Sequence, residues 1–323
     1  MVGWRQSTPG GTAGGVEAMR VHPAPELTVA VVTWNSAGHL PGLLAALPAA
    51  LSGLTRWQLV VADNGSSDDS RELVAKLAPD TVLLALGGNL GFAAGVNAAI
   101  AACPPSRAVL ILNPDVRPAE GMAARLLEAL GEPGNGIAVP RLVSSDGRLH
   151  YSLRREPTVS RMVSQALLGR MAGRLSALGE VVSDPAFYER PCTVDWATGA
   201  AMMVSRSCMD AVGPWDESFF LYSEETDFAL RSRDRGFRTR YVPQAVAVHL
   251  GGDSMYSQRL WSILTLNRVR LFTRRHGPVR SAAFRAAVIV NEGLRSLLPG
   301  RHEHRAALRA LLVTTHRPEQ TSL

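Results

Sequence analysis

Apolar runs separated by polar turns and amphipathic stretches predict strands that alternate with helices in the first third of the chain. Leucines at helical spacing follow the first run, a helix ending near Leu77 follows the second, and a glycine-rich turn precedes a helix over residues 93–102. Ser66 or Ser67 is expected to cap the helix that ends near Leu77. This alternation favours a parallel sheet with right-handed crossovers. The four runs are rich in β-branched residues, as buried parallel strands are, and cover residues 27–33, 58–62, 81–85 and 108–112.

The pattern loosens after Gly121 and predicts smaller elements. A helix over residues 122–130 and a short strand over 136–140 come next. Residues 155–182 then read as one amphipathic helix, which either packs on the main domain or touches a membrane or a lipid-linked acceptor. An ordered block over residues 194–252 holds the densest cluster of polar side chains.

We therefore expect an α/β protein whose sheet is flanked by helices and followed by a helical extension. Residues 1–25 are rich in glycine, proline and small residues and predict a disordered leader without the apolar core of a signal peptide. The main domain is expected over residues 26–255 and the helical region over 256–323, with its last ten residues frayed. The chain has no uninterrupted apolar run of about 18 residues, so a membrane span is not expected.

Composition and charge narrow the class of protein. Of 323 residues, 46% are apolar and 19% charged, which excludes fibrous and wholly disordered proteins. The net charge is +6, and Lys76 is the sole lysine among 34 basic residues. Since arginine suits bidentate contact with phosphate, diphosphate substrates, anionic lipids and nucleic acid all stay candidate partners. The widely spaced Cys103, Cys192 and Cys208 indicate reduced thiols of a cytoplasmic protein.

Polar residues follow several of the predicted strands, at the sheet edge where ligands bind in doubly wound folds. Thr33 and Asn35 follow the first strand, Asp63 the second and Asp115 the fourth. Asp63 is suited to accept hydrogen bonds from a ribose or a base imide. Asp115 lies in an Asn-Pro-Asp turn whose proline, Pro114, fixes the backbone, so it could ligate Mg²⁺ or Mn²⁺ together with diphosphate oxygens and water. A second protein ligand is then expected elsewhere.

Three acids stand beside an aromatic stretch in the later block. Glu224 and Asp227 are expected to cap the helix that begins there, at its positive end. Glu225 could instead face the crevice and act as a general base toward an acceptor hydroxyl. His249 ends a short strand before Gly-Gly and is the candidate for the missing metal ligand.

Three functions, of a dehydrogenase, a nucleotidyltransferase and a nucleic-acid binder, could each account for part of this pattern. The glycine loop over residues 87–95 resembles a dinucleotide loop, but that fingerprint belongs on the first strand–helix turn, where residues 34–38 hold one glycine. A nucleotidyltransferase would share the strand-end acids but release pyrophosphate. A nucleic-acid binder would need stacking aromatics among the C-terminal arginines, where only Trp261 and Phe272 are near, so no nucleic-acid partner is expected.

Taken together, these motifs resemble family 2 glycosyltransferases, and most closely their bacterial rhamnosyltransferase-like branch. The resemblance runs from about Leu27 to about His276. Each motif is weak alone, whereas seven in the expected order are specific. They are Thr-Trp-Asn at 33–35, Asp-Asn-Gly-Ser-Ser-Asp at 63–68, Gly-Asn-Leu-Gly-Phe-Ala-Ala-Gly-Val-Asn at 88–97, Asn-Pro-Asp at 113–115, Thr-Gly-Ala at 198–200, Glu-Glu-Thr-Asp-Phe at 224–228 and His249.

The resemblance implies a GT-A fold and an inverting transfer from a nucleotide-diphosphate sugar. Asp63 matches the family's nucleoside-binding acid, and Asp115 matches the last acid of its metal-binding element, whose first acid is Asn113 here. Glu225 matches the base position, where many relatives have Asp, so Glu224 or Asp227 could contribute to base catalysis. The remaining matches are Asn89, Gly91 and Asn97 in the loop lining the donor site, Arg231 near the acceptor or diphosphate, and His249 as a metal ligand.

Substrates and location follow from the resemblance and the charge pattern. The branch favours dTDP-rhamnose, with UDP- and GDP-sugars as alternatives. A glycan or lipid-linked acceptor is expected, and a lipid-linked glycan, a cell-wall linker or a small metabolite would each fit. The rival reading is a GT-A-like protein that has lost catalysis and only binds a nucleotide or partner, against which Asp115, Glu225 and His249 argue. The basic segments at 155–182 and 257–285 favour peripheral contact with the inner face of an anionic membrane. Self-association through the C-terminal helices is left open.

Overall fold

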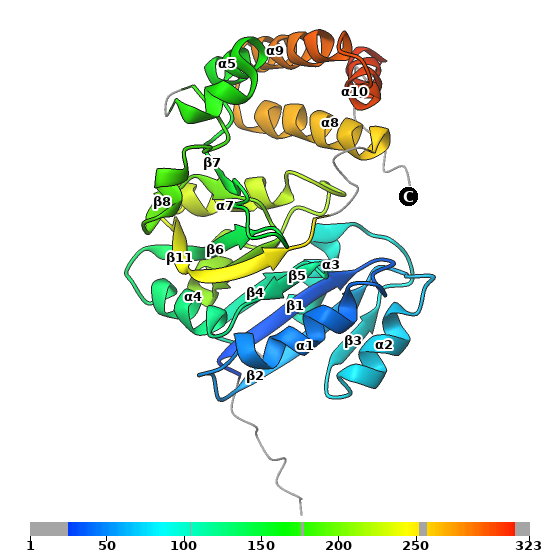
Figure 1. The fold of residues 1–323 in the computed structure, drawn as a ribbon, viewed down its shortest axis with the longest axis vertical. Helices are drawn as coiled ribbons and strands as arrows, with labels where there is room; N and C mark the ends of the chain where they lie inside the picture. The colour runs from blue at the N-terminus through cyan, green and yellow to red at the C-terminus, as the bar shows by residue number, and fades with distance from the viewer. Residues whose placement is uncertain (1–24, 104, 176–177, 252–256, 314–323) are drawn as a thin grey trace, which may run out of the picture.

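A mixed sheet forms the centre of the molecule, with helices on both faces and a separate helical layer at one end (Figure 1). The structure is a computed structural model and describes residues 25–103, 105–175, 178–251 and 257–313. Within these residues the sheet has nine strands in the order β3-β2-β1-β4-β10-β6-β11-β5, and β8 also pairs with β11. The predicted leader, apart from Pro25, and the last ten residues lie outside the described part of the chain.

The first half of the sheet is parallel, as the alternation of strands and helices predicted. Its strands are β1 (Leu27–Thr33), β2 (Trp57–Asp63), β3 (Val82–Ala85) and β4 (Ala108–Leu112). Helices α1 (Leu40–Ala50) and α2 (Ser70–Leu77) cover one face, and α3 (Phe92–Ala101) covers the other. Every residue of β1 is buried, because the leucines of α1 pack against Val29 and Val31 while the alanines of α3 pack against Ala30 and Val32.

The second half of the sheet differs from the mostly parallel arrangement that was expected. Strand β10 (Ala201–Ser205) runs antiparallel to both β4 and β6 (Asn135–Val143), and β5 (Val116–Pro118) and β8 (Cys192–Val194) run antiparallel to β11 (Arg238–His249). Only β6 and β11 pair in parallel here. The regular strand–helix alternation ends after β4, and strands that are not joined by crossover helices are free to pair antiparallel.

Two of these strands are longer than the sequence pattern predicted. β6 has nine residues where a short strand over residues 136–140 was expected, and β11 has twelve where a short strand was expected to end at His249. The pairing of β11 with β6 shifts between Val242 and Val246. Pro243 lies in that interval, and a proline cannot donate to the ladder, so the apolar pattern is broken while the strand continues.

Shorter elements surround this half of the sheet. α4 (Met122–Leu130) covers β6 and β11, and α6 (Arg206–Val212) and α7 (Glu224–Asp234) lie near β10 and β11. β7 (Leu153–Arg154) pairs with β9 (Trp196–Ala197) in a separate two-stranded sheet that contacts α7. A 3₁₀ turn, η2, covers Pro185–Tyr188.

The single amphipathic helix expected over residues 155–182 is wrong in extent. The helix α5 covers Val159–Leu168 and is followed by a 3₁₀ segment, η1 (Gly169–Arg174). Gly169 has a φ of 57°, a left-handed conformation that ends an α-helix readily. Val181 then bridges to Arg154, so the chain has returned to the sheet region. α5 packs on α9 of the helical layer.

The helical C-terminal region is confirmed and consists of α8 (Gln258–Arg275), α9 (Pro278–Ser296) and α10 (His302–Val313). With α5 these helices form a layer at the top of Figure 1, around a small core of their own. That core includes Met162 of α5 together with Phe272, Phe284 and Leu311. No helix among the described residues is long and apolar enough to span a membrane. The three cysteines are free thiols; Cys208 is buried, whereas Cys103 and Cys192 are half-buried rather than buried as expected.

Candidate active site

The carboxyl ends of β1 and β2 bring Thr33 and Asp63 together. The Thr33 hydroxyl donates to Oδ1 of Asp63 over 2.9 Å, and the Ser66 amide donates to Oδ2 over 3.0 Å. The Asp63 side chain is 1% exposed, so its carboxylate is held by the chain itself. Ser66 therefore holds the carboxylate of Asp63. The helix α2 begins at Ser70, and its N-cap is Asp69, so the prediction of a cap at Ser66 or Ser67 is wrong.

Asn35 ties the loop after β1 to the loop after β2. Its backbone is left-handed, with a φ of 49°, and its Oδ1 accepts a 2.8 Å hydrogen bond from the Ser67 amide. The Asn35 amide in turn donates to the Ser66 hydroxyl over 2.9 Å. These contacts fix the two loops at the sheet edge where the strand-end residues meet.

The glycine-rich loop before α3 contacts the segment that precedes the three acids Glu224, Glu225 and Asp227. The Phe92 amide donates to the carbonyl of Phe220 over 3.0 Å. Gly91 has a φ of 92°, and a β-carbon there would lie 3.0 Å from Cα of Phe220, so this close approach requires glycine. Asn89 stabilises the loop by accepting a 3.1 Å hydrogen bond from the Gly91 amide.

Asn97 has a structural task that the sequence did not reveal. Its side-chain nitrogen donates to the carbonyl of Trp215 and to Glu217, and its side-chain oxygen accepts from the Trp215 amide over 2.9 Å. The amide of Asn97 therefore positions residues 215–217. No local sequence motif indicates this role of Asn97, because it depends on hydrogen bonds to residues more than 100 positions away.

The helix that carries the three acids begins at a strained turn. Tyr222 and Ser223 have φ values of 68° and 75°, which are uncommon for residues other than glycine and cluster at functional sites. Asn267 of α8, which is 4% exposed, donates to the carbonyls of Leu221 and Tyr222 over 2.9 and 3.3 Å. The helical layer thus braces the turn that presents Glu224 and the following residue.

The acids do not cap α7 in the way the sequence suggested. Ser223 is the N-cap, and no side chain makes a capping hydrogen bond. Asp227 instead forms a 2.7 Å ion pair with Arg231, one turn later. The three acids nevertheless lie in the first turn of α7, at the positive end of the helix, as the sequence predicted.

Glu224 and Glu225 each bury a carboxylate oxygen that has no hydrogen-bond partner among the described residues, Oε2 in both cases. Burial and the neighbouring Glu225 raise the pKa of Glu224 well above its usual range. Burial also raises the pKa of Glu225, although backbone amides and the nearby charge of Arg154 partly oppose this. An acid with a raised pKa and a free oxygen is suited to exchange a proton with a bound hydroxyl.

Glu225 is connected to the turn that carries Asp115. A β-carbon on Gly199 would lie 3.5 Å from Cβ of Glu225, so this acid packs on the Thr-Gly-Ala segment. The carbonyl of Ala200 accepts a 2.9 Å hydrogen bond from the amide of Asn113. The acid and the Asn-Pro-Asp turn are therefore separated by one short stretch of backbone.

Asp115 and His249 face one another, with 3.2 Å between Oδ2 and Nε2. They meet because β5 pairs with β11, placing Val116 opposite His249. Burial raises the pKa of Asp115, but the hydrogen bond and charge of His249 outweigh it and leave that pKa below its usual value. The ring of His150 packs edge-on against His249, with centroids 5.5 Å apart.

The pair offers one oxygen and one nitrogen to a cation. No group of three or more His, Cys, Asp or Glu side chains within the described ranges is arranged to hold a metal ion. A divalent cation here would need most of its ligands from a bound diphosphate and water, which is how Mg²⁺ is commonly held. The donor types fit such a cation, and the protein alone does not complete its coordination sphere.

Arg117, which the sequence analysis did not single out, clamps the Asn-Pro-Asp turn. Its Nη1 donates to the carbonyls of Pro114 and Val116 over 3.0 and 2.9 Å. Its Nη2 donates to the carbonyl of His39 over 2.9 Å, just before α1. One side chain thus joins the turn carrying Asp115 to the loop after β1.

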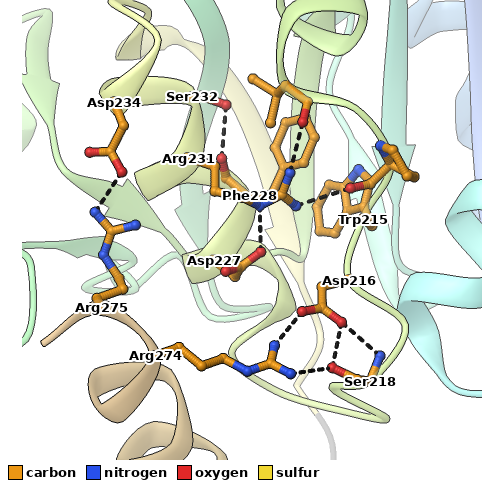
Figure 2. A network of polar contacts seen from close by, with 12 residues as sticks. Trp215, Asp216, Ser218, Asp227, Phe228, Arg231, Ser232, Asp234, Arg274 and Arg275 are labelled. Atoms are coloured by element: carbon orange, nitrogen blue, oxygen red, sulfur yellow. Dashed lines mark hydrogen bonds and ion pairs between the residues drawn. The ribbon is translucent and has the colours of Figure 1, made fainter. Parts of the chain in front are cut away.

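Arg231 is engaged within the protein through three of its nitrogens (Figure 2). Besides the ion pair with Asp227, it donates to the carbonyls of Val212 and Pro214, each over 3.0 Å. Figure 2 also shows Arg274 of α8 paired with Asp216 in the same loop. Arg231 therefore holds the loop that leads to the acids.

Comparison with family models finds two matches along the chain. Residues 28–184 match the model of glycosyl transferase family 2. Residues 156–286 match the model of glycosyl transferase family group 2. Together these matches span the sheet, the acids and the first helix of the C-terminal layer.

Two curated relatives resemble the chain over most of its length. An N-acetylglucosaminyl-diphospho-decaprenol L-rhamnosyltransferase of Mycobacterium tuberculosis is 32% identical over 237 residues, covering 69% of this chain and 75% of the relative. The low-salt glycan biosynthesis hexosyltransferase Agl10 of Haloferax volcanii is 27% identical over 227 residues, covering 69% of this chain and 67% of the relative.

A solved structure shares the fold at low sequence identity. The mannosyltransferase PcManGT from Pyrobaculum calidifontis, in complex with GDP-Man and Mn²⁺, superposes with a TM-score of 0.53 at 17% identity. The match covers 90% of this chain and 74% of the other. The likeness therefore includes both the sheet and the helical layer.

Proposed function

The chain belongs to glycosyltransferase family 2, in its rhamnosyltransferase-like branch, and we propose that it transfers rhamnose from dTDP-rhamnose to a hydroxyl of a lipid-linked glycan with inversion at the anomeric carbon. One observation carries this proposal. Glu225, whose Oε2 has no hydrogen-bond partner in the described part of the chain, packs on the Thr-Gly-Ala segment, and the backbone of that segment is hydrogen-bonded to the turn of Asp115. This link through residues 199 and 200 supports the pairing of a base at Glu225 with a diphosphate-binding residue at Asp115.

The choice of donor and acceptor is supported by the relatives. The M. tuberculosis relative is named for transfer of an L-rhamnosyl group to a decaprenol-linked sugar, and it is the more similar of the two described above. UDP- and GDP-sugars are the competing donors, since strand-end contacts of the kind proposed for Asp63 suit several bases. A lipid-linked acceptor would bring the enzyme to the cytoplasmic face of the cell membrane, and the reaction is proposed to take place there.

Asp115 and His249 would hold a divalent cation, Mg²⁺ or Mn²⁺, together with the donor diphosphate. When bound, such a cation would neutralise the charge that develops on the leaving diphosphate. Their 3.2 Å separation and their oxygen and nitrogen donors support this assignment. Arg117 would keep Asp115 in place by fixing both sides of its turn.

Glu225 would take the proton of the acceptor hydroxyl as that oxygen attacks the anomeric carbon from the face opposite the diphosphate. Displacement from the opposite face inverts the anomeric configuration. A carboxylate in this role contributes roughly 10²–10⁴-fold to the rate. Glu224, whose pKa is raised further, would stay protonated beside it, and Asp227 would hold Arg231.

A donor screen tests the proposal. Purified protein is titrated calorimetrically with dTDP-rhamnose, UDP-sugars and GDP-mannose, each with Mg²⁺ or Mn²⁺, and release of nucleoside diphosphate is followed with a lipid-linked acceptor. We expect tightest binding and turnover with dTDP-rhamnose. Preference for another donor would reject the rhamnosyl assignment, and donor binding without turnover by any acceptor would favour a protein that has lost catalysis.

A further inference from the structure

The helical layer exposes an extended apolar surface on α5, η1, α9 and the segment after α9, which we call the apolar face. Leu167 is 72% exposed, Val279 82% and Leu297 77%. Along α9 the exposed positions from 282 to 294 are apolar and recur at helical spacing, and Arg280 is the exposed charged residue of its first turn. The side chains that define the face are Leu167, Met171, Val279, Val290, Leu294 and Leu297.

A groove between α5 and α9 runs through this face. Its volume is about 480 Å³, and all eight of its lining residues are valine, alanine or leucine, including Val163, Leu167 and Val290. Contiguous apolar surface of this kind is uncommon on proteins that meet only water and marks a site of contact with a protein or a membrane.

The charges around the apolar face have one sign. Residues 159–175 and 257–313 contain two acids, Glu292 and Glu303, and both are buried within the layer. Glu292 accepts hydrogen bonds from Trp261 and His304 there. The outward surface of these segments therefore presents no acidic side chain, whereas exposed arginines stand on the same segments at positions 174, 280, 301, 305 and 309.

We propose that the apolar face docks on an anionic lipid bilayer. Its leucine and valine side chains would enter the boundary between headgroups and acyl chains, and the surrounding arginines would contact headgroup phosphates. A second copy of this chain fits less well. A twofold interface would bring two cationic rims together, and like charges across an interface oppose association.

The layer is joined to the catalytic part of the molecule through α8. Asn267 of this helix holds the strained turn before the acids, and Arg274 pairs with Asp216 in the loop that leads there (Figure 2). A bilayer on the apolar face would thus lie on the far side of α8 from that turn (Figure 1).

Vesicle flotation of the full chain tests the proposal. We expect wild-type protein to float with phosphatidylcholine vesicles that contain phosphatidylglycerol, and to bind less to pure phosphatidylcholine and at raised salt. The double variant Leu167→Glu, Val290→Glu is expected to lower the partition coefficient at least about tenfold, because two apolar side chains would no longer leave water. The matched control Leu77→Glu alters an exposed leucine of α2, on another part of the molecule, and should bind like wild type.

Two results would overturn the proposal. One is absence of wild-type flotation, or equal flotation of wild type and the double variant when circular dichroism shows both folded. The other is sedimentation of wild type as a dimer that the double variant dissociates, which would assign the face to a second copy. The assay contains neither donor nor acceptor, so its outcome does not depend on glycosyl transfer.

Discussion

Gly42 of α1 lies against the guanidinium of Arg117, and a β-carbon at this glycine would come within 2.6 Å of Nη2. A glycine in the first turn of a helix weakens the helix by about 1 kcal/mol relative to alanine. Here it leaves the space in which Arg117 reaches the carbonyls of His39, Pro114 and Val116. The glycine in α1 and the turn that presents Asp115 are therefore coupled.

We expect Gly42→Ala and Arg117→Gln to share one defect, because both remove the guanidinium from the same three carbonyls. Loss of such a supporting contact lowers metal affinity about 10–100-fold in metal sites. The metal concentration for half-maximal transfer should rise by that order, while donor turnover at saturating metal changes less. Arg117→Lys should not restore it, since an ammonium lacks the planar fork.

Arg125→Gln provides the control, because Arg125 also donates to a backbone carbonyl, that of Glu120, but on an exposed surface away from the turn. Its metal dependence should match wild type. A normal metal titration for Gly42→Ala, in protein of wild-type stability, would show that the close approach has no bearing on Asp115.

The sequence predicted the strand ends well and the supporting contacts poorly. Thr33, Asp63 and Asp115 could be placed because the ends of adjacent parallel strands meet at one edge whatever else the chain does. The pairing of Asp115 with His249 was also anticipated, and the two lie 3.2 Å apart. Their roles toward metal and nucleotide stay predictions until ligands are bound.

The missed features depend on contacts between distant segments. Arg117 is one of many arginines, and its importance comes from carbonyls on two separate loops. Asn267 lies in a regular helix, yet its side chain donates a hydrogen bond to the carbonyl of Tyr222, 45 residues earlier in the chain. The prediction of one long helix over residues 155–182 was wrong because Gly169, with its positive φ, ends α5, although the apolar residues continue at helical spacing beyond it.

Asp115→Ala and His249→Ala are expected to weaken metal-dependent donor binding while leaving metal-independent binding of the nucleoside intact. Each variant removes one of the two proposed protein ligands, and a bound cation would then rely on the other one, the diphosphate and water. Calorimetric titration of donor with and without Mn²⁺ measures the difference. His150→Phe retains the edge-on ring against His249 and should titrate like wild type; equal behaviour of all three variants would contradict the metal assignment.

Ionisation of Glu225 should determine how turnover falls on the acidic side of the pH–rate profile. The residue must be ionised to accept a proton, and burial raises its pKa above the ordinary value of about 4.3. Turnover should therefore fall as the pH drops through that raised pKa. Glu225→Gln should lower turnover about 10²–10⁴-fold with donor affinity retained, whereas near-normal turnover would reject Glu225 as the base.

Removing the charge of Arg154 should move that limb to higher pH. The guanidinium of Arg154 lies over the ring of Trp196 and partly opposes the effect of burial on the pKa of Glu225. Arg154→Met loses this charge, so Glu225 should require a higher pH to ionise. Turnover measured from acid to neutral pH checks the direction. Arg148→Met, at an exposed site, is the control, and an acid-going shift for Arg154→Met would contradict the assignment.

Asn267→Ala should reduce turnover more than donor affinity, because Asn267 braces the turn before Glu224 and not the nucleotide-binding edge. Two hydrogen bonds of about 1 kcal/mol each would be lost, next to two strained residues that cost about 1–3 kcal/mol each. A roughly tenfold or larger fall in kcat is expected at similar donor KM. Ser262→Ala removes a hydroxyl from the exposed side of the same helix and should leave both constants unchanged; parallel losses in the two variants would indicate general destabilisation of α8.

Glu292 of α9 should make the helical layer sensitive to acid. Burial raises its pKa, but hydrogen bonds from His304 and Trp261 outweigh burial and leave that pKa below its usual value. A carboxyl with a lowered folded-state pKa contributes stability that is fully present above its unfolded pKa of about 4.3. This contribution is lost as the pH falls through the lower, folded-state pKa.

Glu292→Gln should therefore unfold more easily near neutral pH, since losing a hydrogen bond to a charged group costs about 1.5–3 kcal/mol, and it should lose less further stability than wild type on acidification. Urea unfolding between about pH 7 and pH 3 measures both effects. Glu128→Gln, at an exposed position of α4, should follow the wild-type curve. If Glu292→Gln kept the wild-type slope of stability against pH, the acid sensitivity would have to come from other carboxylates, because the pair of Glu292 and His304 would then contribute no proton linkage.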